Sequence, residues 1–567
     1  MFLAIPLVLV VFTHLWNPAG FPTIHPDEGY YIGRSIHVSE GLGPKEDAAR
    51  YDHPYFAWLF LGSIFNLIGY PDSANPTPGD ANSIEMVWLF PRATMGILAV
   101  IDTFLIYKIA ERRYNRNVAF IAAILFAVMP YTWLIRRFLI EPIQLPFLLT
   151  SILFALYSGT KAKVKQKSEL KEIVRVRSGT GTEENEGMRL REETSERKAT
   201  EKEEQQQQRG QRQGKGYDDN NNYYRGQKIM SNQNIILLLS SGIFLGLTIF
   251  AKIPAITLIP LVGFIVFTNN RKKGFKALGI WIIPVILIPL IWPIHALSAG
   301  DLDQWQEGIL YQTTRISKPL FDAVNDFYNK DPILLILGTA GFVFAAVTRK
   351  DFIFLIWVIP FFALFYVVDY VSHFHLIPLI PAFCIAAAVM IADISDRIMK
   401  NKKLVHKILP IAIISAIAVF GLISTTSLIV KSRNSSYFDI IALVTKYLPE
   451  DPEKLNIATD GIATKGDEHV TVIGTSKQFW IFQYVFDKLG YDYKSPNNML
   501  SKMKLEDARE GSEKVLMIAD ENMQKIVTGK ELPRTSKAEI KAERLSDLYN
   551  NTKTVAKTHK VEIRTNY

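Results

Sequence analysis

Long apolar runs alternate with short polar connections from the N-terminus to about residue 430. A helix rises about 1.5 Å per residue, so a run of about 20 apolar residues matches the hydrocarbon core of a bilayer. The runs are too many for the core of a soluble protein. The pattern therefore predicts a polytopic α-helical membrane protein with about eleven transmembrane helices, at residues 1–16, 86–109, 117–134, 138–157, 234–251, 253–268, 275–297, 332–348, 351–369, 376–394 and 407–430.

Basic residues are concentrated in connections that fall on one side of this arrangement. Positively charged loops are retained on the cytoplasmic side of a membrane. The three larger connections on the other side, 17–85, 298–331 and 431–567, are then expected outside a multi-pass plasma membrane protein. The connections that fix this orientation read "ERRYNRN" (111–117), "NNRKKG" (269–274), "TRKD" (348–351) and "DRIMKNKK" (396–403).

A polar insert at 158–233 falls on the predicted cytoplasmic side. It contains "EEQQQQRGQRQGKGYDDNNNYY" and almost no large aliphatic residues. Such a composition cannot bury a core, so we expect the insert to be disordered. A tolerated loop insertion is the favoured interpretation, and a regulatory or docking segment is the alternative.

The tail 431–567 has a different pattern from the membrane domain 1–430. Its short runs "VTVIGT", "KVLMIAD" and "VEIRTN" are typical of strands, and "SKQFWIFQYVFDKLG" is typical of a helix. The pattern predicts a small α/β domain outside the membrane. Asn434-Ser-Ser and Asn550-Asn-Thr are N-glycosylation sequons on the same side, which is a weak signal.

The net charge of +9 does not change this interpretation of the chain as a membrane protein. In a soluble chain it would suggest nucleic acid as a partner. Here the excess Lys and Arg is explained by the cytoplasmic loops, so we expect membrane lipids and no nucleic acid. The single cysteine, Cys384, excludes a disulfide or a cysteine-based metal site within one chain.

Ionisable side chains gather at the predicted outer ends of the spans. Singly, each has an ordinary explanation, because Arg and Lys snorkel and a loop carboxylate is usually solvated. Together they suggest a site, since ionisable groups at such depths usually face a cavity or one another. Carboxylates can take a proton from a hydroxyl, and cations can hold a phosphate. The set comprises Asp27, Glu28, Asp52, His53, Arg92, Arg136, Arg137, Glu141, Lys252, Asp369, His373 and His375.

The chain contains, in this order, the stretches "HPDEGYY…YDHPYFAWLFLGSIFNLIG", "RRFLIEP", "LGLTIFAKIPA" and "HFHLIPLIPAF". Together they resemble the GT-C glycosyltransferases, most closely the protein O-mannosyltransferases and the aminoarabinose transferases of the lipid A pathway. The resemblance covers about residues 1–430. Tyr55 replaces a second proline, Glu141 stands where Asp is commoner, and 298–331 is too short for the inserted domain of the mannosyltransferases.

The resemblance implies transfer of a sugar from a polyprenyl-phosphate donor to a hydroxyl of a protein, lipid or glycan outside the membrane. Asp27 corresponds to the proposed base, Glu28 to its partner, and Lys252 to a lysine that meets the lipid phosphate. Displacement would be direct and inverting. No cofactor is required, although a divalent metal is compatible with the reaction. The other candidate substrate-binding residues are His53, Arg92, Arg136, Arg137, Glu141, His373 and His375.

Two other classes of protein are compatible with many membrane spans. A transporter also carries ionisable residues in its spans, but usually near the midplane and on broken helices. A membrane-anchored sensor would bind its ligand through the tail. That interpretation leaves Asp27, Arg136 and Lys252 without a role. Glycosyl transfer by the purified protein would distinguish the three classes.

Overall fold

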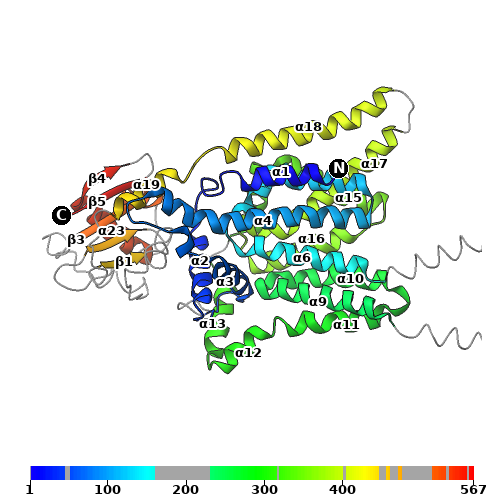
Figure 1. Ribbon diagram of the computed structural model, residues 1–567, viewed down its shortest axis with the longest axis horizontal. Coiled ribbons are helices and arrows are strands. Elements are labelled where there is room, and N and C mark those ends of the chain that lie inside the picture. The colour runs from blue at the N-terminus through cyan, green and yellow to red at the C-terminus, as the bar shows by residue number, and fades with distance from the viewer. Residues whose placement is uncertain are drawn as a thin grey trace, which may run out of the picture.

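Apolar helices form a bundle, and a small mixed sheet lies beyond one end of it in this computed structural model (Figure 1). Most of the insert that was expected to be disordered lies outside the residues that the structure describes, which include only its two ends. The helix expected at 476–490 also lies outside them. The structure describes residues 2–44, 51–159, 230–313, 315, 318–399, 404–445, 455–459, 470–474, 514–530, 536–557 and 561–567.

Every predicted span contains helical residues, but several helices are short. Among the described residues, six helices are long and apolar enough to cross a membrane, or eight if two bent pairs each count as one span. The predicted count of about eleven is therefore only partly supported. The bundle elements are α1 (Ala4–Leu15), α4 (Ala81–Arg113), α5 (Arg116–Val128), η2 (Pro130–Arg136), α6 (Ile140–Tyr157), α9 (Asn232–Ala251), η3 (Ile253–Leu258), α10 (Ile259–Asn269), η4 (Arg271–Lys273), α11 (Gly274–Leu287), α12 (Ile291–Ser298), α15 (Pro332–Thr348), α16 (Ile353–Val368), η5 (His373–Leu379), α17 (Ile380–Met399) and α18 (Leu404–Ile429).

Short polar side chains define where several of these helices begin. Asp80 accepts hydrogen bonds from the backbone N–H groups at the start of α4, and Asn115 does the same for α5. Ser231 caps α9, and Asp331 caps α15. Because the first turn of a helix leaves its N–H groups without carbonyl partners, such acceptors fix the point at which each span starts.

Further helices lie at the end of the bundle nearer the sheet. Helices α2 (Pro26–Ser39) and α3 (Phe56–Ile68) pack against each other there, and α13 (Leu302–Thr313) lies close to them (Figure 1). Helix α3 ends at Gly69, whose φ of 63° is a left-handed conformation that glycine adopts without strain. The remaining elements of this part of the chain are η1 (Asp72–Ala74) and α14 (Leu320–Lys330).

The C-terminal sheet confirms the prediction of a small α/β domain. Its strand order is β1-β2-β3-β5-β4. The first three strands are parallel, and β5 pairs antiparallel with both β3 and β4. The elements are α19 (Ser435–Val444), β1 (Leu455–Thr459), β2 (Val470–Gly474), β3 (Lys514–Asp520), α22 (Glu521–Val527), α23 (Ser536–Asn551), β4 (Lys553–Lys557) and β5 (Val561–Thr565).

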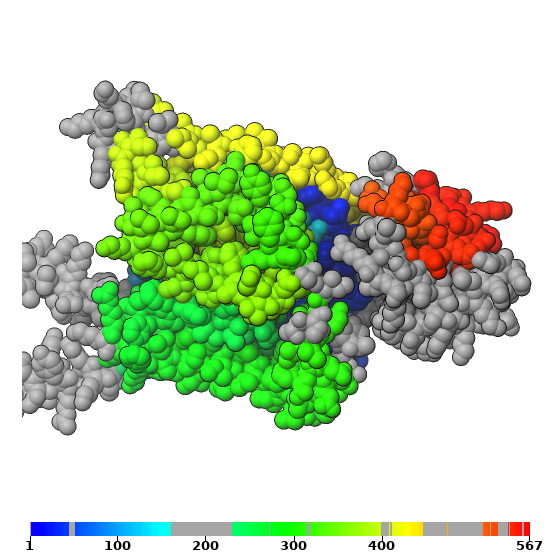
Figure 2. Space-filling view, turned by 180° about the vertical axis from the view of Figure 1, so that it is seen from behind, coloured from blue at the N-terminus to red at the C-terminus, as the bar shows by residue number. Residues whose placement is uncertain are grey.

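The insert and the tail leave the bundle at opposite ends. Helices α6 and α9 meet the insert at the end away from the sheet (Figures 1 and 2). There the backbone N–H of Gly159 donates to Asn234 Oδ1 at 2.6 Å, so the two ends of the insert lie together. This arrangement agrees with the predicted topology. The basic loops predict that this end of the bundle faces the cytoplasm, and that orientation stays a prediction.

Candidate active site

The acidic pair lies in the first turn of α2, where a helix dipole favours negative charge. His25 precedes the helix, and its Nδ1 accepts a hydrogen bond from the backbone N–H of Asp27 at 3.3 Å. The backbone N–H of His25 donates to Glu28 Oε1 at 2.8 Å, which completes a capping box. Neighbouring residues in a helix point about 100° apart, so the two carboxylates face different surroundings.

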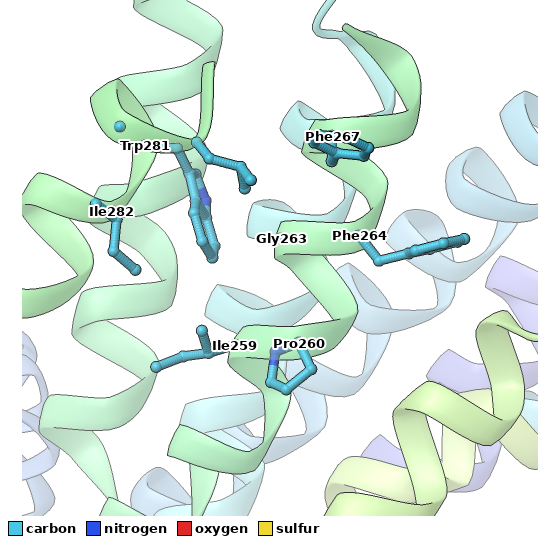
Figure 3. A pocket seen from close by; sticks show the side chains of 9 residues that line it. Ile259, Pro260, Gly263, Phe264, Phe267, Trp281 and Ile282 are labelled. Atoms are coloured by element: carbon cyan, nitrogen blue, oxygen red, sulfur yellow. The ribbon is translucent and has the colours of Figure 1, made fainter. Parts of the chain in front are cut away.

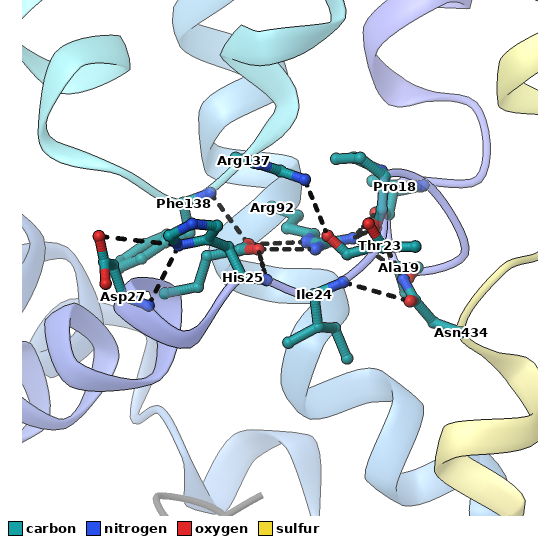
Figure 4. A network of polar contacts seen from close by, with 12 residues as sticks. Pro18, Ala19, Thr23, Ile24, His25, Asp27, Arg92, Arg137, Phe138 and Asn434 are labelled. Carbon is teal, nitrogen blue, oxygen red and sulfur yellow. Dashed lines mark hydrogen bonds and ion pairs between the residues drawn. The ribbon is translucent and has the colours of Figure 1, made fainter. Parts of the chain in front are cut away.

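Glu28 is fully buried against Arg92 of α4. Arg92 Nε and Nη2 each donate to one carboxylate oxygen at 2.9 Å, and the backbone N–H of Phe138 donates at 3.1 Å (Figure 4). Burial alone would raise the pKa of Glu28, but the Arg92 guanidinium holds it below its ordinary value. Glu28 therefore acts as a charged anchor that fixes the start of α2.

Two predicted substrate-binding arginines instead bind the backbone that leads into α2. Arg92 Nη1 donates to the carbonyls of residues 18, 19 and 22 at 2.7–3.3 Å. Arg136 donates from Nη1 and Nη2 to the carbonyls of residues 13, 16 and 17 at 2.6–2.9 Å. Carbonyls at the end of a helix have no helical partner, and a nearby cation satisfies them. These arginines thus shape the loop after α1.

Asp27 is the accessible member of the acidic pair. Its side chain is 39% exposed, and Oδ2 lies 3.7 Å from His25 Nδ1. The Arg137 guanidinium is close enough for its charge to interact with that of Asp27. Arg137 lies over the ring of Trp133, and its Nη1 is 3.4 Å from His373 Nε2. Arg137 Nη2 also donates to the Thr23 carbonyl at 3.4 Å, so its charge is held near the acidic pair.

Lys252, Glu141 and His375 come from three different elements and form a second group. Lys252 Nζ donates to Glu141 Oε1, and His375 Nε2 lies 3.7 Å from the same oxygen. His375 Nδ1 accepts from the backbone N–H of Ser372 at 3.0 Å, so the proton of the neutral ring is on Nε2. Gln144 of α6 donates to the Lys252 carbonyl at 3.1 Å and ties α6 to the end of α9.

A third group of side chains comes from α2, from α3 and from the connection between these two helices. Arg34 Nη1 donates to Asp52 Oδ1 at 2.8 Å and lies over the ring of Trp58. Burial raises the pKa of Asp52, but Arg34 holds it below its ordinary value. Burial lowers the pKa of His53 to about 3 against the opposing effect of Asp52, and the charge of Lys252 contributes to the lowering. His53 is therefore neutral at physiological pH.

Tyr31 is a buried side chain of α2 on which one carboxylate from each of the three groups acts. Burial raises the pKa of Tyr31 well above its ordinary value, and the charges of Asp27, Glu141 and Asp52 raise it further. The sequence contained a signal for this arrangement, because Asp27, Tyr31 and Arg34 follow the i, i+4, i+7 spacing of one helix face. Sequence reasoning nevertheless missed Tyr31 and Arg34.

Sequence reasoning also missed Arg315, for which no motif gives a signal. Its guanidinium lies over the rings of Tyr311 and Tyr370, and its charge acts on Asp52, His53 and His375. The connection 298–331, which was expected to lie outside the membrane, therefore contributes a cation to the same site.

Two other predicted residues lie at the edge of this site. His373 Nδ1 is 3.9 Å from Asp326 Oδ2, and its backbone carbonyl accepts from the hydroxyl of Tyr131. Asp369 ends α16 with a φ of 50°, and its carbonyl accepts from the backbone N–H of Lys318. Among the residues that the structure describes, no group of three or more His, Cys, Asp or Glu side chains could hold a metal ion. The prediction that no metal is required is not tested by this.

An apolar groove of about 570 Å³ lies between α10 and α11, away from these polar groups (Figure 3). Ile259 and Gly263 of α10 line it together with Trp281 and Ile282 of α11. Ile259 follows directly on η3, which itself follows Lys252. The groove therefore begins about two helical turns along the chain from the lysine.

No family model matches the sequence, and no curated protein matches it. Several solved structures share its fold. The apo oligosaccharyltransferase of Archaeoglobus fulgidus superposes with a TM-score of 0.53 at 13% identity, over 93% of this chain and 70% of that one. The same enzyme tethered with an acceptor peptide gives 0.50 at 12%, over 97% and 71%.

ArnT from Cupriavidus metallidurans bound to undecaprenyl phosphate gives a TM-score of 0.50 at 11% identity, over all of this chain and 97% of that one. These are GT-C membrane glycosyltransferases, so the GT-C fold expected from the sequence is confirmed. At such low identity the likeness establishes the fold and leaves the activity to be argued from the site.

Proposed function

We propose that this chain is a glycosyltransferase that moves a sugar from a polyprenyl-phosphate donor to an acceptor hydroxyl at the outer face of the membrane. One observation carries the proposal. The pairing of Glu28 with Arg92 leaves Asp27 as the accessible carboxylate of the pair, on the α2 face that meets the Lys252 group. A general base must be accessible to the hydroxyl whose proton it takes.

The donor has two chemically different parts, and this chain offers a surface for each. Lys252 and Arg315, whose charges act on His53, and Arg137, whose charge acts on Asp27, are cations that can hold a phosphate. The apolar groove that begins at Ile259 can accept part of a polyprenyl chain. The related ArnT structure holds undecaprenyl phosphate, and the related oligosaccharyltransferase structure holds an acceptor peptide, which supports a donor of this kind.

The reaction is a direct displacement. Asp27 accepts the proton of the acceptor hydroxyl while the hydroxyl oxygen attacks the anomeric carbon. The bond from that carbon to the phosphate oxygen breaks, and its electron pair leaves with the lipid phosphate. Lys252 and Arg137 stabilise the charge that develops on this phosphate. The configuration at the anomeric carbon inverts, and the acceptor is a hydroxyl of a protein, lipid or glycan.

One observation favours a second candidate, an ion-coupled transporter. Asp102 is fully buried within α4, and neither of its carboxylate oxygens has a hydrogen-bond partner among the described residues. Carboxyl groups inside a membrane often belong to proton relays. Asp102 lies ten residues, or about 15 Å, along α4 from Arg92, so a transferase predicts that Asp102→Asn leaves glycosyl transfer unchanged.

The test is transfer by the purified full-length protein with a panel of polyprenyl-phosphate sugars and peptide, lipid and glycan acceptors. The expected result is release of the polyprenyl phosphate together with an acceptor of inverted anomeric configuration, with the rate unchanged by EDTA. Absence of transfer from every donor, together with uptake of a solute into proteoliposomes that Asp102→Asn abolishes, would replace the transferase by the transporter.

A further inference from the structure

The segment that joins α18 to the C-terminal domain is bound to the loop that leads into α2. Asn434 Nδ2 donates to the carbonyls of Ala19 and Pro22 at 2.7 and 2.8 Å, and Asn434 Oδ1 accepts from the backbone N–H of Ile24 at 3.3 Å (Figure 4). We name this set of contacts between residues 429–434 and residues 17–24 the clasp. Its other two bonds run from Asn17 Nδ2 to the Ile429 carbonyl and from the Arg433 N–H to the Gly20 carbonyl.

The clasp shares atoms with the anchor of the acidic pair. The carbonyls of Ala19 and Pro22 accept from Asn434 and also from Arg92 Nη1. Arg92 in turn holds both oxygens of Glu28, the residue next to Asp27. A continuous set of hydrogen bonds therefore joins Asn434 to the first turn of α2. A shift of loop 17–24 would move the Asp27 carboxylate.

The same residue joins this network to the C-terminal domain. Asn434 is only 3% exposed and directly precedes α19. Helix α19 buries Phe438 and Ile441, and it packs against both α4 and β5. The sheet, α19 and Asn434 thus form one connected path to the loop.

The sequence suggested another role for Asn434, as an N-glycosylation sequon. Glycosylation requires a free side-chain nitrogen, but Asn434 Nδ2 is buried and donates two hydrogen bonds. In the folded protein this nitrogen is not available to a transferase. The sequon interpretation of Asn434 is therefore replaced by a structural one.

We propose that Asn434 is a positioning residue through which the C-terminal domain fixes loop 17–24 and the carboxylate of Asp27. This inference rests on the proposed transferase function for its catalytic consequence. Misplacing a reacting group by about 1 Å costs about 10²-fold in rate. Loss of the clasp should lower kcat and leave donor affinity unchanged, because the clasp does not contact Lys252.

The test compares Asn434→Asp with Ser436→Ala in the full-length protein. Asn434→Asp keeps the size and the acceptor but removes both Nδ2 hydrogen bonds, and we expect kcat to fall about 10- to 100-fold with the donor KM within about twofold. Ser436→Ala destroys the sequon but leaves Asn434 intact, so its kcat should equal that of the wild type. An Asn434→Asp enzyme with normal kcat, or a Ser436→Ala enzyme with the same loss, would overturn the proposal.

Hydrogen–deuterium exchange provides a readout that does not depend on any transferase activity. In Asn434→Asp, the amides of residues 18–28 should exchange faster while those of β3 and β5 keep wild-type rates. Unchanged exchange in residues 18–28 would refute the clasp even if the wild type proved to transfer no sugar. Should Asn434→Asp fail to fold, Asn17→Gly removes the bond to Ile429, tolerates the φ of 50° at that position, and must show the same local effect.

Discussion

Arg92 and Glu28 form a bidentate ion pair in which both side chains are 0% exposed. The remaining nitrogen of the guanidinium donates to three carbonyls of the loop before α2. A buried ion pair is stable only when its further hydrogen-bonding groups are satisfied, as they are here. Glu28 therefore fixes the structure of the site, whereas its neighbour Asp27 stays accessible within it.

Loss of the Glu28 charge should affect stability before it affects chemistry. Glu28→Gln leaves Arg92 buried without a counter-charge, and breaking a buried pair in this way costs about 3–5 kcal/mol. We expect a clearly lower midpoint of thermal unfolding in detergent. The control is Asp27→Asn, which should unfold at the wild-type temperature because its side chain is partly exposed. Equal midpoints for Glu28→Gln and the wild type would contradict the assigned role.

The two neighbouring arginines should respond differently to the same substitution. Arg136→Gln removes three hydrogen bonds to the end of α1 and should lower stability, while the folded fraction keeps its activity. Arg137→Gln removes a charge beside Asp27 and should lower kcat by about 10²-fold with little change in unfolding, since removing one charge-stabilising group typically has this effect. Kinetics normalised to folded protein distinguish the two. The reverse pattern would assign phosphate binding to Arg136.

Lys252 should act on the donor. Lys252→Ala should raise the donor KM about tenfold or more, because a charge-assisted hydrogen bond contributes about 1.5–3 kcal/mol. Lys252→Arg should restore only part of this, since a planar guanidinium does not replace a compact ammonium.

The partner of Lys252 supplies the control for this experiment. Lys252→Ala alone leaves Glu141 buried without its cation, so the double variant with Glu141→Gln separates donor binding from stability. If the double variant binds donor as the wild type does, Lys252 only neutralises Glu141.

The insert should be dispensable for the reaction. The hydrogen bond from Gly159 to Asn234 shows that its ends meet, so a short Gly/Ser linker can replace residues 165–228 without stretching α6 or α9. We expect unchanged kcat and KM from the purified deletion variant. A well-folded deletion variant without activity would show that the regulatory interpretation was the right one.

The sequence predicted the parts of this molecule that depend on length and periodicity. The apolar runs located the helices of the bundle, and strand-like runs located β2, β3 and β5. Strand β4 was missed because "KTVAK" carries only two apolar residues, and its register with β5 is set by the neighbouring strand rather than by its own pattern. The predicted count of about eleven spans is only partly supported, because several of the apolar helices have fewer than 18 residues.

The site was harder to predict because residue type does not reveal the partner of a charge. Arg92, Arg136 and Arg137 all donate to backbone carbonyls before α2, yet only Arg92 forms an ion pair with Glu28. Asn434 has the pattern of a sequon and the environment of a buried cross-link. These distinctions depend on which backbone atoms approach from elsewhere in the chain.

The most direct test of the account is the rate of sugar transfer by Asp27→Asn. The substitution keeps the size and shape of the side chain and removes only its ability to accept the acceptor's proton. Loss of a general base typically costs about 10² to 10⁴ in rate. We predict a fall of that order in kcat, with unchanged thermal unfolding and unchanged donor binding. Transfer by Asp27→Asn at a near-normal rate, measured with the same donor and acceptor, would contradict the assignment of the base.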